Sequence, residues 1–129
     1  MQLHLLLLLL DEKLVDFVAM DIKNSLENYH KACGRSIDLE RIELSVNLIR
    51  FSGVPYEFRT TVVPGIHTEK DFEAIGEWLD GVGDYALQEY RDEGKILNEE
   101  FMKKQTKEKL DLKKLQKKLQ KKIKRVVVR

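Results

Sequence analysis

The sequence contains very little cysteine, which limits the sites that it can build. Cys33 is the single cysteine among 129 residues, so no disulfide can form within the chain, and we expect a reducing, cytoplasmic location. One thiolate cannot hold an iron–sulfur cluster or a structural zinc ion by itself. We therefore predict an inert thiol at Cys33.

Histidine is also scarce and scattered. His4, His30 and His67 are too far apart in the sequence to predict a metal site. His67 follows a Pro-Gly turn signal, and we interpret it as a surface-loop residue. The chain is therefore predicted to contain no metal ligand and no catalytic residue.

The apolar runs are too short to cross a membrane. Leucine occupies positions 5–10, whereas a bilayer span needs about 20 apolar residues. No Lys or Arg precedes this run, no small-residue cleavage site follows it, and Asp11 comes next, so we do not expect a signal peptide either. We predict a helix over residues 3–10 that is covered on all sides, at the edge of a larger core.

The net charge is only +1, but its distribution is uneven. Residues 103–129 hold 13 Lys and Arg against two Asp and Glu, whereas residues 1–102 hold 10 against 20. A basic tail raises the possibility of nucleic-acid or membrane contact. However, no aromatic side chain for base stacking lies among its lysines. The tail also contains apolar residues at spacings of three and four: Leu112, Leu115, Leu119 and Ile123. This spacing predicts instead a helix over about 104–122 that packs on a sheet with its lysines in water.

The clearest local pattern is a strand, a turn and a helix beginning at residue 56. Residues 56–63 alternate and are rich in β-branched side chains, which favours a strand. Pro64 and Gly65 end it, because proline cannot donate to a sheet and glycine permits a sharp turn. Thr68 and Asp71 then have the spacing of a helix N-cap and its capping box.

Similar alternation of strands and helices extends over the whole chain. The apolar run 17–20 predicts a strand buried on both faces. A short helix is expected at 26–31, and a longer one begins after the N-cap Asp38. Further strands are predicted at 85–90 and 125–128. The repeated order of helix and strand predicts one α/β domain over residues 1–129 with a mostly parallel sheet and flanking helices.

Four charged residues fall at or just after the ends of predicted strands: Asp21, Lys23, Arg59 and Arg91. Because the carboxyl ends of parallel strands meet at one edge, we expect these side chains to share a rim. Mixed charges of this kind suit a zwitterionic ligand. The alternative for Arg59 is an ordinary solvated strand residue.

Three segments of the chain carry a family resemblance. They are Val18-Ala19-Met20-Asp21-Ile22-Lys23, Phe58-Arg59-Thr60-Thr61-Val62-Val63-Pro64-Gly65 and Leu87-Gln88-Glu89-Tyr90-Arg91. Their most specific part is an Asp-x-Lys followed at a distance by an Arg-x-x-Val-Val-Pro-Gly. These segments resemble the radical S-adenosylmethionine activating enzymes, in particular the activating proteins of anaerobic ribonucleotide reductase and pyruvate formate-lyase. The resemblance runs from about residue 14 to residue 129.

This resemblance implies the second half of an incomplete parallel (β/α)6 barrel, a partial TIM barrel. It also implies cofactor-binding roles for four residues. Asp21 and Lys23 would lie near S-adenosylmethionine and an associated cation, and Arg59 would contact the same cofactor. Arg91 stands where some members have a histidine that contacts the cofactor. The family enzymes are anaerobic oxidoreductases. An electron from a [4Fe–4S] cluster cleaves S-adenosylmethionine in them, and the resulting radical takes a hydrogen from a glycine of a partner glycyl-radical enzyme.

The chain departs from that family where the cluster would be held. The motif Cys-x-x-x-Cys-x-x-Cys and the glycine-rich stretch for the methionine amine are absent, and both would belong to a half preceding Met1. We therefore expect a truncated or split reading frame that is inactive alone. It would need a cysteine-bearing N-terminal half, or it would self-associate through open sheet edges as a non-catalytic binding module. Binding of nucleic acid through the Lys-rich tail is a further alternative.

Overall fold

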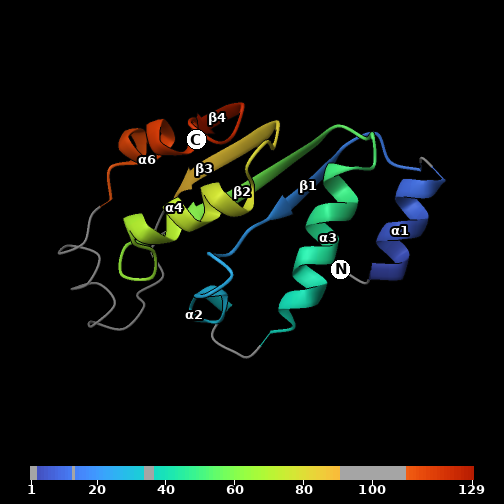
Figure 1. The fold of residues 1–129 in the computed structure, drawn as a ribbon, viewed down its shortest axis with the longest axis horizontal. Helices are drawn as coiled ribbons and strands as arrows, with labels where there is room; N and C mark the ends of the chain where they lie inside the picture. The colour runs from blue at the N-terminus through green and yellow to red at the C-terminus, as the bar shows by residue number, and fades with distance from the viewer. Residues whose placement is uncertain (1–2, 13, 34–36, 91–109) are drawn as a thin grey trace.

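The computed structural model describes residues 3–12, 14–33, 37–90 and 110–129. Within these ranges helices and strands alternate along the chain (Figure 1). The helices are α1 (Leu3–Asp11), α2 (Tyr29–Cys33), α3 (Leu39–Arg50), α4 (Glu69–Trp78) and α6 (Leu112–Leu119). The strands are β1 (Val18–Asp21), β2 (Tyr56–Val62), β3 (Asp84–Glu89) and β4 (Arg125–Val128).

The strands form one parallel sheet in the order β1-β2-β3-β4, which is also their order along the chain. The predicted α/β class and parallel sheet are therefore confirmed, and the architecture is that of a partial α/β barrel. Helix α4 packs against α6, and α1 packs against α3 (Figure 1). Successive parallel connections of the same hand keep the helices on one side of such a sheet.

Alternate residues of β2 separate the two faces of the sheet. Phe58, Thr60 and Val62 are almost fully buried and point toward the helices, where apolar residues of α3, α4 and α6 complete the core. Arg59 and Thr61 point to the other face, where they keep contact with solvent. We call this second surface the open face. Only one side of the sheet is covered by helices in the described part of the chain.

The turn chemistry between β2 and α4 is as predicted. Gly65 has φ of 90°, in the left-handed region that glycine occupies at no steric cost. Thr68 is the N-cap of α4, and its side chain accepts from the Asp71 backbone N–H while the Asp71 carboxylate accepts from the Thr68 N–H. The predicted N-cap of α3 is confirmed too, with Asp38 accepting from the Arg41 N–H.

Two predictions of complete burial are wrong. In the strand predicted at 17–20, Phe17 is 53% exposed and Ala19 is exposed, because the open face beneath β1 has no cover. In α1, Leu6 and Leu10 are buried but Leu8 is 52% exposed, because this helix packs on α3 along one side. The short second helix also lies slightly later than expected, at Tyr29–Cys33.

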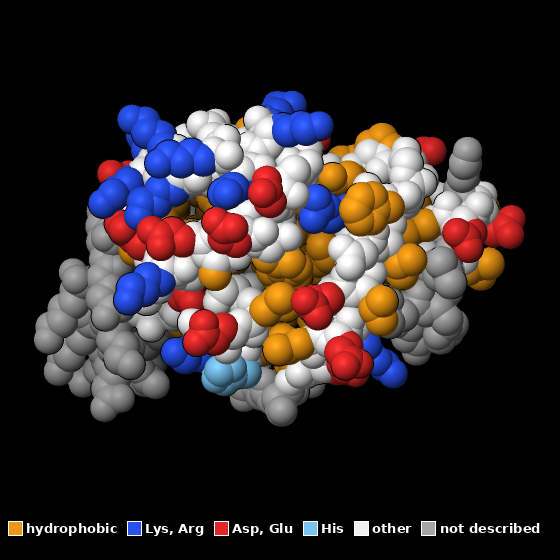
Figure 2. Space-filling view, viewed as in Figure 1, with side chains coloured by type: hydrophobic (Ala, Val, Ile, Leu, Met, Phe, Trp, Pro, Cys, Tyr) orange, Lys and Arg blue, Asp and Glu red, His pale blue; other side chains and the backbone are white. Residues whose placement is uncertain are grey.

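The basic C-terminal helix, α6, buries its apolar side and forms ion pairs with α4. Its apolar stripe is buried as predicted, with Leu115 and Leu119 each 1% exposed. Its lysines are exposed as predicted, except Lys118, which is partly buried and contacts Glu69 and Glu73 of α4 at 3.1 Å. Figure 2 shows these basic and acidic side chains gathered side by side over α6 and α4. The predicted beginning of this helix, at 104–109, lies outside the described residues.

Candidate functional site

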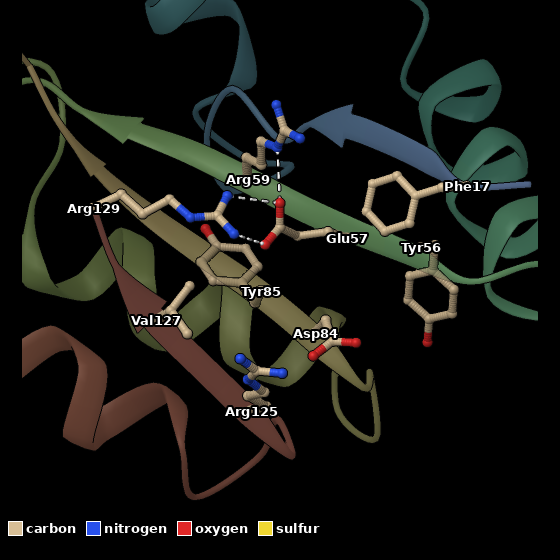
Figure 3. Close-up of a pocket in the computed structure, with 9 residues that line it drawn as sticks. All are labelled: Phe17, Tyr56, Glu57, Arg59, Asp84, Tyr85, Arg125, Val127 and Arg129. Carbon is tan, nitrogen blue, oxygen red and sulfur yellow. Dashed lines mark hydrogen bonds and ion pairs between the residues drawn. The ribbon is translucent and has the colours of Figure 1, made fainter.

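A hollow of about 370 Å³ lies on the open face of the sheet (Figure 3). Charged side chains from β2, β3 and β4 line it, together with the ring of Phe17 before β1. They are Glu57, Arg59, Asp84, Arg125 and Arg129. Rigid neighbouring strands thus bring acids and bases from distant parts of the sequence onto one surface.

Glu57 is the centre of this cluster, because two arginines bind its carboxylate. The Arg59 Nε donates to Glu57 Oε2 at 2.9 Å. Arg129 binds the same group with both terminal nitrogens, Nη1 to Oε2 at 2.9 Å and Nη2 to Oε1 at 2.7 Å. Such a two-pronged arginine–carboxylate contact is strong and directional. Figure 3 shows the two guanidinium groups reaching Glu57 from different directions.

The electrostatics of Glu57 follow from its burial and its partners. Its side chain is only 10% exposed, and burial acts to raise the pKa of the carboxyl. The hydrogen bonds and positive charges of Arg129 and Arg59 outweigh that effect, so the net pKa of Glu57 is lowered. Glu57 is therefore a fixed anion at neutral pH, suited to holding cations in place and not to moving a proton.

A small residue on β3 makes this contact possible. Arg129 continues β4, since its N–H donates to Leu87 O at 2.8 Å, whereas Glu57 belongs to β2. The side chain of Arg129 must therefore cross the open face of β3. Ala86 is the β3 residue in register with Arg59 and with Val127. Its methyl group leaves room for the guanidinium to pass.

The structure brings most of the predicted cofactor residues together. Asp21 is the register partner of Arg59, and in a parallel pair both side chains point to the same face. The Lys23 ammonium contacts the Asp21 carboxylate at 3.2 Å, and both groups are exposed. Arg59 lies within β2, not at its end, and it is level with Asp21 because β1 stops earlier. Arg91 lies outside the described residues.

His67 is buried, contrary to its interpretation as a surface-loop residue. It is 2% exposed, and its Nδ1 accepts from the Val63 N–H at 2.9 Å. Its Nε2 must then carry the proton, which it donates to Lys23 O at 2.8 Å. The imidazole thereby links the backbone after β1 to the backbone after β2, and it fixes the segment that carries Asp21 and Lys23 beside Arg59.

Asp71 anchors the same loop from the helix side. It is 3% exposed, and its Oδ1 accepts from Ser25 Oγ at 3.0 Å and from Asn28 Nδ2 at 2.6 Å. Burial acts to raise the pKa of Asp71, but the hydrogen bonds from Asn28, Thr68 and Ser25 outweigh it, and the pKa is lowered. The capping carboxylate of α4 therefore also holds the loop after β1.

The available groups match those of an organic zwitterion. Asp21, Lys23 and Arg59 offer a carboxylate, an ammonium and a guanidinium, which match the amine, hydroxyl and carboxylate groups of a zwitterionic ligand. Among the described residues no group of three or more His, Cys, Asp or Glu could hold a metal ion. In the same part of the chain no helix has the length and apolar character of a membrane span.

Glu57, Arg129 and the inward position of His67 were not predicted from the sequence. Glu57 and Arg59 are two apart on a strand, so their shared face could have been noticed. No comparable signal links Arg129 to either of them. That contact depends on the neighbouring positions of β2, β3 and β4, which only the folded sheet defines.

Comparison with known proteins gives one informative match. The chain is 31% identical over 125 residues to a Methanocaldococcus jannaschii protein described as "Putative glycyl-radical enzyme activating enzyme". The match includes 94% of this chain but 52% of the relative, so the chain spans about half of the relative's length. No family model matches the chain, and no solved structure matches it.

Proposed function

We propose that this chain forms the second half of a radical S-adenosylmethionine activating enzyme, whose substrate is a glycine of a partner glycyl-radical enzyme. The observation that carries the proposal is the match to the M. jannaschii protein, which includes nearly all of this chain and about half of the relative. The parallel sheet with helices along one face supports it, since half of a barrel has this form.

In this proposal Asp21, Lys23 and Arg59 bind S-adenosylmethionine on the open face. The supporting geometry is the row that Asp21 and Arg59 share across β1 and β2, with Lys23 paired to Asp21. These groups fit the cofactor, because its amine and hydroxyls pair with a carboxylate and its carboxylate pairs with cations. Arg91 is proposed as a further contact on the strength of the resemblance in its segment.

The residues of this chain do not fit a [4Fe–4S] cluster, since Cys33 is its one cysteine. The cluster, which supplies the electron for cleaving S-adenosylmethionine, must therefore be held by other residues. We propose that a complementary part, corresponding to the half of the relative outside the match, provides them. The chain without that part is expected to be inactive.

Reconstitution tests this function. The complementary half of the M. jannaschii relative would be produced together with this chain, loaded anaerobically with iron and sulfide, and assayed for binding of S-adenosylmethionine and release of deoxyadenosine. We expect both from the pair. Arg59→Ala should weaken binding about tenfold or more, through loss of charge-assisted hydrogen bonds.

Glu73→Gln is a matched control, because Glu73 is an exposed ion-pair residue on the helix side. It should leave binding unchanged. A pair that forms a stable complex and carries a cluster, yet binds no S-adenosylmethionine, would refute the proposed function. Deoxyadenosine release by this chain alone would refute the need for a complementary half.

A further inference from the structure

We propose that Glu57 is a positioning residue for Arg59, and that Arg129 fixes Glu57 in turn. The arrangement leaves the terminal nitrogens of Arg59 directed to an anionic oxygen pair of the ligand. This inference rests on the proposed function, since it concerns the same cofactor site. It adds two residues for which the sequence pattern gave no role.

The first step is the way in which Arg59 uses its donors. Its contact with Glu57 is made through Nε at 2.9 Å. Among the residues that the structure describes, neither Nη atom of Arg59 has a partner. A guanidinium held by its Nε edge keeps its two terminal nitrogens available, and two parallel N–H groups match a carboxylate.

The second step is that Glu57 is itself held rigidly. Arg129 occupies both of its oxygens, so the carboxylate cannot rotate away from Arg59 without losing two hydrogen bonds. The Arg59 side chain is long and 34% exposed, so without the contact to Glu57 it could adopt many rotamers. Ordering it in advance lowers the entropy that ligand binding must otherwise overcome.

The third step concerns the Arg129 guanidinium. Both of its Nη atoms donate to Glu57; Oε2 of that carboxylate accepts from both arginines, whereas Oε1 accepts from Arg129 alone. Arg129 therefore neutralises Glu57, and Arg59 keeps a positive charge that Glu57 alone would cancel. This charge balance is what makes an anionic group the expected partner of the Arg59 terminal nitrogens.

One arm of the test needs no ligand. In the full chain, the Arg59 Nε proton should exchange slowly with water, because Glu57 accepts its hydrogen bond, and ¹⁵N NMR of the arginine side chain measures this exchange rate. Glu57→Gln should reduce this protection, because a neutral amide oxygen is a weaker acceptor than a carboxylate, while the backbone spectrum keeps its folded dispersion. Glu73→Gln serves as the control and should leave the Arg59 signal as it is.

The second arm is a double-mutant cycle in the reconstituted pair, with S-adenosylmethionine as the probe. Glu57→Gln alone should weaken binding about tenfold. In the Arg59→Ala background the same change should have almost no further effect, because Glu57 acts through Arg59. A carboxylate that merely stabilised the fold would weaken binding by the same factor in both backgrounds.

The outcomes separate the two proposals. If the wild-type pair binds S-adenosylmethionine but the effects of the two substitutions on affinity multiply, or Glu57→Gln leaves the Nε–H protection unchanged, the positioning role is refuted and the proposed function stands. If the assembled wild-type pair does not bind S-adenosylmethionine, the proposed function fails, and this inference fails with it. Non-additive losses of S-adenosylmethionine affinity, together with reduced protection of the Arg59 Nε proton in Glu57→Gln, support both the proposed function and the positioning role.

Discussion

Single buried polar residues hold the loop that follows β1 in place. Asp71 was expected only to cap α4, but it also accepts hydrogen bonds from Ser25 and Asn28, more than 40 residues away in the sequence. His67 adds a second link between the segments after β1 and β2. These two buried side chains place Asp21 and Lys23, although neither belongs to the proposed binding surface.

Asp71→Asn should reduce stability by about 2 kcal/mol at neutral pH, because amide hydrogens would face buried donors. The wild-type pKa of Asp71 is lowered below its ordinary value of 3.8. Its contribution is therefore complete above pH about 4 and is lost as the pH falls through the folded-state pKa. Urea unfolding at a series of pH values checks this.

Asp38→Asn provides the matched comparison, because Asp38 caps α3 at an exposed position. It should cost less, and it should change the acid dependence less than Asp71→Asn does. Equal acid dependence in the wild type and Asp71→Asn would contradict the assignment of this carboxylate as a buried anion.

At the scale of helices and strands, the sequence predicted most of the structure. Strands with alternating apolar residues and helices with capping signals were placed correctly, because both patterns are local. The prediction that β1 is buried on both faces was wrong, because burial of its second face depends on whether another layer covers the open face, which the local pattern does not reveal. The Glu57–Arg129 contact was likewise hidden, since it joins strands that are not adjacent in the sheet.

The contact between α4 and the C-terminal segment pairs opposite charges from the acidic and basic parts of the chain. Lys114 and Lys118 both contact Glu69, and Lys122 contacts Glu77 at 3.5 Å. Acids of the body and lysines of the tail thus neutralise one another across a helix interface. Lysines engaged in this way are less available to phosphates, which weighs against the nucleic-acid alternative.

Lys118→Ala should lower the urea midpoint of unfolding, because Lys118 bridges Glu69 and Glu73 and its pKa is raised by those hydrogen bonds. The effect should shrink at high salt, since exposed ion pairs are screened. Lys117→Ala removes an exposed lysine from the same helix and should have a smaller effect. Equal, salt-independent changes in the two variants would exclude a role for the ion pairs.

For the whole molecule, the open face and the outer strands are the surfaces most suited to association with another chain. Phe17 is 53% exposed beside the hollow, and both outer strands have a free edge within the described part of the chain. Exposed apolar surface and unpaired strand edges favour association. The complementary half of the proposed enzyme would cover this surface, and a second copy of the chain could do so in its absence.

Phe17→Lys should therefore reduce self-association of the isolated chain in sedimentation velocity measurements over a range of concentrations. Phe51→Lys is the control, because Phe51 is 78% exposed but follows α3 in the helix layer. We expect it to leave association largely unchanged. A wild-type chain that remains monomeric at all concentrations would contradict this prediction.

The order of the strands has a consequence for how the chain folds during its synthesis. Each strand pairs only with the strands before and after it in the sequence. Every new strand that leaves the ribosome can therefore join the last one formed. The paired residues are still well separated in the sequence, as for Val18 with Tyr56 and Asp84 with Arg125, and parallel pairing over such separations is slow. The sheet can grow in this way strand by strand, and the Glu57–Arg129 contact would be among the last to form.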